Sequence, residues 1–99
     1  MGDARVALIR EWLAQELGWP RTLRLEPASA DASFRRYFRV WGPAGDTRVV
    51  MDAPPDQEDT GPYLRISGLL RACGVHVPAI EAADTARGFL LLEDLGGTH

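Results

Sequence analysis

Residues 30–40 read ADASFRRYFRV and residues 47–52 read TRVVMD, with the sequence WGPAGD between them. The small residues at the start are typical of a loop, whereas the alternating aromatic and basic residues that follow favour a strand. Gly and Pro in residues 41–46 favour a turn, and the β-branched residues after it favour another strand. The stretch therefore predicts a loop, a strand, a turn and a second strand.

Alternation along these two strands assigns their side chains to opposite faces of a sheet. On the first strand, one face carries Phe34, Arg36, Phe38 and Val40, and the other carries Ser33, Arg35, Tyr37 and Arg39. On the second strand, Arg48, Val50 and Asp52 share one face. Together with a strand that precedes them, they form a predicted antiparallel meander.

Apolar periodicity outside this stretch predicts two helices and three further strands. These elements are a helix over residues 4–17, a strand over 21–26, a helix over 62–73, and strands over 79–83 and 88–93. Asp3 is a predicted cap of the first helix, and Gly18 follows its end. Pro27 is expected to end the first strand, so that residues 28–33 form a loop.

Three kinds of side chain are expected to be structural. Trp12 and Trp19 are predicted to pack in the core. The second helix has an apolar stripe of Tyr63, Ile66, Leu70 and Cys73, which predicts that Cys73 is a small core residue. His76 has no Cys or carboxylate at ligand spacing and is interpreted as a structural or surface residue.

Composition limits the classes of function. The chain has 99 residues, 45% hydrophobic and 25% charged, which is typical of a folded domain with a modest core. Its net charge of −3 does not favour nucleic acid as a partner. All 11 basic side chains are arginines, which excludes a phosphate-binding or Schiff-base lysine. A lone cysteine and the lack of a signal peptide or membrane span lead us to expect a soluble cytoplasmic protein.

Four blocks of the sequence resemble the aminoglycoside phosphotransferase and choline kinase family: residues 32–40, 50–55, 74–78 and 88–96. They are most similar to its bacterial branch of anomeric kinases, which phosphorylate N-acetylmuramate and N-acetylglucosamine and belong to cell-wall amino-sugar recycling. The resemblance implies an α+β fold, the N-terminal lobe of a kinase. This lobe has a five-stranded antiparallel sheet, an N-terminal helix and one helix packed on the sheet.

The resemblance also divides the chain and implies a nucleotide site. Residues 1–20 would form the N-terminal helix, residues 21–93 the nucleotide-binding lobe, and residues 94–99 the start of a hinge. The backbone of Ser29, Asp31, Ala32, Ser33 and Phe34 would approach the ATP phosphates. Tyr37 and Val50 would cover the adenine, and main-chain groups of Glu93, Asp94 and Leu95 would hydrogen-bond its edge.

One departure from the family pattern concerns charge. A kinase lobe sets a lysine of the third strand against a glutamate of the next helix, and this pair orients the phosphates. Here the strand position is Asp52, and the helix has Arg65 and Arg71 but no acid. We therefore hypothesise that Asp52 supports an arginine, either Arg65 or Arg35, which supplies the positive charge for phosphate.

A second departure concerns the catalytic groups, because no His-x-Asp segment follows Glu93. We expect the chain to be an N-terminal part of a kinase that is inactive alone. The complete protein would use ATP and Mg²⁺, with the metal ligands outside this chain, and its substrate would be a small amino sugar. Neither nucleic acid nor membrane is an expected partner. The lobe alone would expose Tyr37, Val50 and Leu95, so we expect it to self-associate or to be marginally stable.

An alternative is a stand-alone module that binds a ligand or a protein without chemistry. Its strongest feature is a set of three arginines interleaved with aromatic residues, which could stack on single-stranded nucleic acid. The set consists of Arg35, Arg36 and Arg39 with Phe34, Tyr37 and Phe38. Salt-dependent oligonucleotide binding would favour this alternative, and specific protection by MgATP would favour the kinase lobe.

Overall fold

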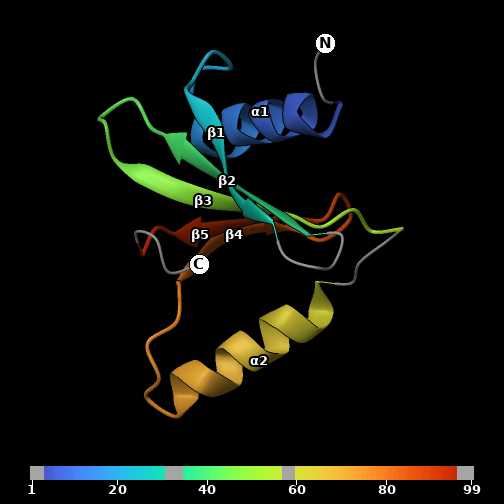
Figure 1. The fold of residues 1–99 in the computed structure, drawn as a ribbon, viewed down its shortest axis with the longest axis vertical. Helices are drawn as coiled ribbons and strands as arrows, with labels where there is room; N and C mark the ends of the chain where they lie inside the picture. Colours follow the sequence, from blue (N-terminus) through green and yellow to red (C-terminus); the bar gives the residue numbers. More distant parts are fainter. Residues whose placement is uncertain (1–3, 31–34, 57–59, 96–99) are drawn as a thin grey trace.

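The computed structural model describes residues 4–30, 35–56 and 60–95. The described elements, in chain order, are α1 (Ala4–Leu17), β1 (Leu25–Ala30), β2 (Arg36–Trp41), β3 (Thr47–Asp52), α2 (Gly61–Ala72), β4 (Ile80–Asp84) and β5 (Phe89–Glu93). The five strands form one antiparallel sheet in the order β1-β2-β3-β5-β4. Figure 1 shows α1 on one side of this sheet and α2 on the other. This confirms the predicted α+β architecture.

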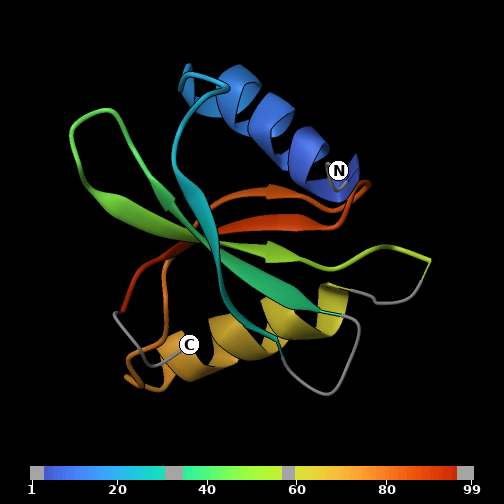
Figure 2. The same ribbon diagram turned by 45° about the horizontal axis from the view of Figure 1, so that its top comes forward.

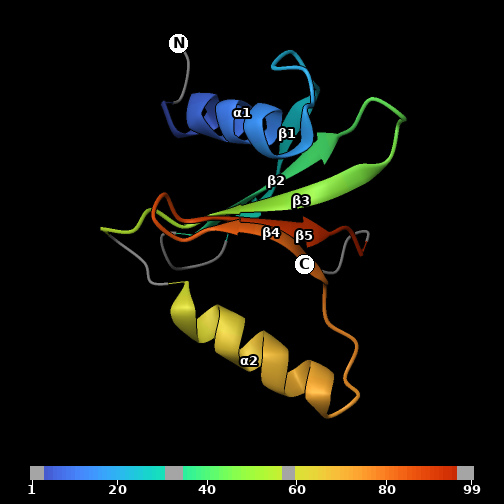
Figure 3. The ribbon, with the colours of Figure 1, turned by 180° about the vertical axis from the view of Figure 1, so that it is seen from behind.

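The centre of the sheet is the β2–β3 hairpin and the pairing of β3 with β5. Phe38 lies opposite Val50, and Arg36 lies opposite Asp52. On the other side of β3, Asp52 lies opposite Phe89. Because β3 pairs with β5, the chain leaves the sheet after β3, forms α2, and returns through β4 at the edge. Seen from behind, β4 and β5 lie between the two helices (Figure 3).

The first face of the sheet is covered by α1. Its apolar periodicity buries Ile9, Trp12 and Leu13, and Gly18 follows the helix with a positive φ of 68°. These residues contact the sheet residues of the same cluster, which are Phe38, Val40, Val50, Phe89 and Leu91. The Trp12 and Phe89 ring centroids are 5.6 Å apart, and Trp19 packs against the cluster. The predicted packing role of both tryptophans is therefore confirmed.

The second face carries a smaller cluster under α2. Its buried members are Val49, Met51, Ala53, Leu90 and Leu92. Tyr63 and Leu64 of α2 pack against it, together with Tyr37 and Ile80. The alternation predicted for β2 and β3 is confirmed, because Val50 and Val49 enter different clusters. Figure 2 shows the strands passing between the two helices.

The first strand differs from the prediction. β1 begins at Leu25 and continues through Pro27 to Ala30, so Pro27 does not end it and residues 28–30 are not a loop. β1 is an edge strand, where a missing backbone N–H can be tolerated. Its register with β2 also shifts between Pro27 and Ser29, which accommodates the irregular backbone.

The contact face of α2 also differs from the prediction. Ser67 is its buried residue at 7% exposure, whereas Ile66 is 56% exposed and Cys73 is exposed. Cys73 is therefore not a core residue. Figure 1 shows α2 sloping away from the sheet towards its C-terminal end, so its last turns do not reach the apolar face. Among the described residues, neither helix is long and apolar enough to cross a membrane.

Candidate nucleotide-binding site

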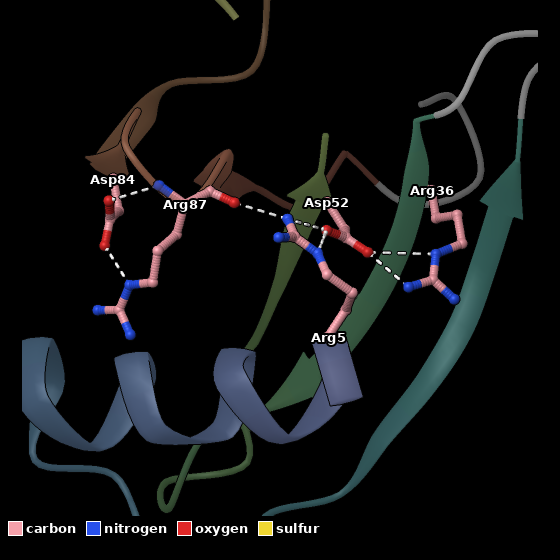
Figure 4. A network of polar contacts seen from close by, with 5 residues as sticks. All are labelled: Arg5, Arg36, Asp52, Asp84 and Arg87. Atoms are coloured by element: carbon pink, nitrogen blue, oxygen red, sulfur yellow. Dashed lines mark hydrogen bonds and ion pairs between the residues drawn. The ribbon is translucent and has the colours of Figure 1, made fainter. Parts of the chain in front are cut away.

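Asp52 lies at the centre of a charged network where β3 ends and β2 begins. Its carboxylate is fully buried. Arg5 of α1 donates from Nε and Nη2 to Oδ1 at 2.9 and 2.6 Å, and Arg36 donates from Nε and Nη2 to Oδ2 at 3.2 and 2.6 Å. Figure 4 shows the two guanidinium groups on either side of the carboxylate. Each carboxylate oxygen is thus occupied by an arginine.

The same end of the sheet includes the turn between β4 and β5. Arg5 Nη2 also donates to the backbone oxygen of Arg87 at 2.6 Å, so Arg5 joins α1 to this turn. Arg87 pairs with Asp84 at 2.7 Å, and its backbone N–H donates to the same carboxylate. The Arg87 guanidinium and these N–H donors lower the pKa of Asp84 from its ordinary value.

The network corrects the hypothesis about the partner of Asp52. In the structure, Asp52 forms ion pairs with Arg5 and Arg36 rather than with Arg65 or Arg35. Arg65 is exposed on α2, on the other side of the sheet. Arg35 precedes β2 and lines a hollow beside α2. Asp52 faces α1, so it does not meet an arginine from α2.

Tyr37 and Val50 lie on opposite faces of the sheet. Val50 is fully buried in the cluster beneath α1, whereas Tyr37 packs beside the cluster beneath α2. The structure therefore does not bring them together on one surface, and the expected exposure of Val50 is wrong. The register predicts this separation, because Val50 pairs with Phe38, the neighbour of Tyr37.

A hollow of about 310 Å³ lies between the start of β2 and α2. It is lined by Arg35, Pro62, Tyr63, Ile66, Ser67, Leu70, Val77 and Pro78. Burial raises the pKa of the Tyr63 phenol, and the positive charge of Arg35 opposes this shift. The hollow thus combines an apolar wall with one guanidinium and one neutral phenol, which suits an anionic ligand that also has an apolar surface.

The three expected hinge residues lie at and after the end of β5. The Glu93 backbone N–H donates to the Ala79 oxygen at 2.8 Å, and its carboxylate accepts from the Ala79 N–H at 3.2 Å. Asp94 accepts from Arg39 of β2 at 2.7 and 3.1 Å, and Leu95 is half-buried. The Asp94 hydrogen bond raises the pKa of Arg39. Both carboxylates therefore have structural partners, which ties this segment to the sheet.

The remaining predicted site residues are Ser29 and residues 31–34, which precede β2 in the sequence. Asp31, Ala32, Ser33 and Phe34 lie outside the described residues. Ser29 belongs to β1, where its backbone lies opposite Tyr37. Of the expected phosphate-binding segment, the structure therefore places only Ser29.

The described residues also include side chains of the types that bind metal ions. Within the described part of the chain, no group of three His, Cys, Asp or Glu residues could hold a metal ion. Asp52 already has both oxygens engaged by arginines. These residues therefore do not fit a resident Mg²⁺ site.

Sequence reasoning missed Arg5 and Arg36 as partners of Asp52. Arg36 had a usable signal, because it shares the face of Phe38 on a strand adjacent to the one that ends in Asp52. The sequence contains no such signal for Arg5, because its contact with Asp52 depends on how α1 packs across the sheet.

The sequence of this chain, which folds into the sheet and its two flanking helices, matches a known class of protein. The sequence profile described as the phosphotransferase enzyme family matches residues 24–99, and the chain belongs to this family. Among curated proteins, the chain is 50% identical to an N-acetylmuramate/N-acetylglucosamine kinase of Pseudomonas aeruginosa and 48% identical to one of Pseudomonas putida. A kinase of the same name from Neisseria meningitidis is 44% identical.

These matches cover most of this chain but a minor part of each relative. They include 95% of the chain for the two Pseudomonas proteins and 91% for the Neisseria protein. The chain spans 30% of the length of the first two relatives and 26% of the third. The family and the recognised branch are therefore confirmed for this part of the molecule.

Proposed function

We propose that this chain is the ATP-binding lobe of a small-molecule kinase whose acceptor is an amino sugar of the N-acetylmuramate or N-acetylglucosamine type. The observation that carries the proposal is 44–50% identity, over 91–95% of the chain, to three proteins that share this kinase name. The five-stranded sheet with α2 on one face supports the role of a lobe. We place the activity in the cytoplasm, where ATP is available.

Within this lobe, we assign the nucleotide to the face of the sheet that carries Tyr37 and α2. The loop over residues 31–34 and Ser29 would offer backbone N–H groups to the phosphates. Tyr37 would cover the adenine, and main-chain groups of residues 93–95 would bind its edge. Arg35 would supply the positive charge, since the chain has no lysine for this task.

Phosphoryl transfer depends mostly on positioning and on charge stabilisation, so binding and orienting ATP is a sufficient contribution from one lobe. Arg35 lies beside Tyr63 in the hollow, where an apolar wall would strengthen its attraction for phosphate. Because the described residues do not fit a resident metal site, we assign no metal-bound step to this lobe.

The acceptor is tested with the complete protein that the gene encodes. We expect ATP-dependent phosphorylation of N-acetylmuramate or N-acetylglucosamine, measured as ADP release and as a new sugar phosphate. Glucose and galactose serve as controls that lack the N-acetyl group. A folded, complete protein that phosphorylates neither amino sugar would contradict the proposed acceptor.

The nucleotide is tested with the 99-residue chain. MgATP should raise its melting temperature, because a ligand that binds only the folded state stabilises it by about 2.7 kcal/mol at a hundredfold excess over Kd. Arg35→Gln should reduce this shift, whereas Arg24→Gln, at an exposed site on the linker before β1, should not. An equal melting temperature with and without MgATP would count against the nucleotide assignment.

The stacking role on nucleic acid has less support. Phe38 is buried beneath α1, and Arg36 and Arg39 hold the carboxylates of Asp52 and Asp94. Stacking on bases requires exposed rings and cations that can reach phosphates. The described arginines and aromatic residues of this candidate surface are therefore engaged largely in contacts within the fold.

A further inference from the structure

The Arg5–Asp52–Arg36 network has a geometry that reaches beyond fold stability. Arg36 is the first residue of β2, and Asp52 is the last residue of β3 and its direct partner across the ladder. The ion pair therefore closes the final rung of the β2–β3 pairing. Its two donors reach Oδ2 at 2.6 and 3.2 Å, so the guanidinium approaches as a fork rather than through one contact.

The two hydrogen bonds from the Arg36 guanidinium to Asp52 fix the orientation of the backbone at the start of β2. Successive side chains of a strand point to opposite faces, so holding Arg36 on the face of α1 directs Arg35 to the face of α2. There Arg35 lines the hollow with Tyr63 and Ser67. A rotation of the chain at Arg36 would move Arg35 out of this hollow.

Burial makes this contact stiff. The Asp52 side chain has no exposed surface, and a buried carboxylate that loses a partner leaves an uncompensated charge. Arg36 also lies over the Phe38 ring at 5.2 Å, which restrains its stem. If the Arg36 guanidinium moved away, the buried Oδ2 of Asp52 would lose both of its hydrogen bonds from Arg36.

We propose that Asp52 is a positioning residue for nucleotide binding, which acts through Arg36 to fix the start of β2 and thereby to present Arg35 to the ATP phosphates. Asp52 itself does not touch the nucleotide. The inference rests on the proposed function, because it assigns the phosphate contact to Arg35. Arg5 holds the other carboxylate oxygen and joins α1 to the sheet, so it contributes to stability rather than to this alignment.

The first test uses the complete protein and compares two matched substitutions at the same carboxylate. Arg36→Lys keeps the charge but removes the fork, and we expect it to raise KM for ATP about tenfold, the effect of one misplaced charged contact. Asp52→Asn should also raise KM for ATP about tenfold, and it should change kcat less than it changes KM. Arg5→Lys should lower the melting temperature and leave KM for ATP within about twofold. Equal rises in KM for Arg36→Lys and Arg5→Lys would overturn the inference.

The second test does not require activity and uses amide hydrogen exchange. In Asp52→Asn and in Arg36→Lys, exchange should increase at residues 36–38 more than at residues 39–41, because only the start of β2 is released. Unchanged exchange at residues 36–38 in both variants would overturn the inference. If the wild-type protein does not bind MgATP, the proposed function fails, while this measurement still decides whether Asp52 positions β2.

Discussion

Asp52 and Tyr63 show, at the scale of single residues, how the two faces of the sheet accommodate polar groups. Asp52 is fully buried beneath α1 and has two guanidinium partners. Tyr63, in the first turn of α2, is partly buried and has the Arg35 charge nearby. The first arrangement is closed and suits positioning, whereas the second borders a hollow and suits contact with a ligand.

The Tyr63 phenol provides a pH-dependent test of the hollow. Burial raises its pKa above the unfolded value, so its contribution to stability is present below that value and is lost as the pH rises through the folded pKa. In a Tyr37→Phe background, tyrosinate absorbance should report this late ionisation. Arg35→Gln should raise the pKa of Tyr63 further, because Arg35 favours the charged phenolate. A lower or unchanged pKa in Arg35→Gln would show that the two groups do not interact.

Gly88 provides a test of the turn that Arg5 contacts. A Cβ there would lie 1.8 Å from the Ala53 oxygen, and φ is +80°. Gly45 has a similar φ of +85° and open space, so it is a matched control. We expect Gly45→Ala to cost about 1 kcal/mol and Gly88→Ala at least about 2 kcal/mol more, measured by denaturant unfolding. Equal losses would mean that the close approach to Ala53 is absent.

At the scale of elements, α1, β2 and β3 could be predicted because their patterns are local. Alternation assigned the faces of β2 and β3, and helical spacing assigned α1 to residues 4–17. Pro27 led to the wrong end for the first strand. The effect of a proline depends on whether its strand lies at the edge of the sheet, and only the order of the strands decides this.

The contact face of α2 could not be predicted from its composition. Its apolar residues surround much of the helix, so periodicity correctly selected Tyr63 but missed Leu64 and Ser67. For the site, Arg36 could be placed near Asp52 by register, but Arg5 is 47 residues away in sequence. Its contact depends on tertiary packing, which a local pattern does not contain.

Thiol labelling tests the orientation of α2. Cys73 is exposed, so it should react with a thiol reagent in the folded chain at close to the rate in denaturant. In a Cys73→Ser background, Ile66→Cys should also react fast at a site 56% exposed, and Ser67→Cys should react slowly at a site 7% exposed. Fast labelling at position 67 with protection at position 66 would contradict the orientation of the helix.

At the scale of the whole molecule, the two helices cover the sheet unequally. α1 buries three large side chains, whereas α2 buries only Ser67 and contacts the sheet through partly buried residues. The exposed apolar residues of α2 and the link after it are Ile66, Leu69, Leu70 and Val75. An exposed apolar surface of this kind favours association with another surface.

We expect the 99-residue chain to self-associate through this surface in a concentration-dependent way. Leu69 is 67% exposed, so Leu69→Glu should shift sedimentation towards monomer without lowering the melting temperature. Leu8→Glu is a matched control on α1, at a site 38% exposed outside this surface. A monomer at all concentrations, or an equal effect of Leu8→Glu, would contradict the prediction.

The pairing of β3 with β5 has a consequence for cooperativity. The Ala53 N–H donates to the Gly88 oxygen at 2.8 Å, so the sheet itself closes the chain excursion that contains α2. Among the described residues, the ladders of β1, β2, β3 and β5 join strand to strand and include no residue of α2. We therefore expect the amides of α2 to exchange with solvent faster than those of β3 and β5, because opening α2 would break contacts of Tyr63 and Leu64 but no strand pairing.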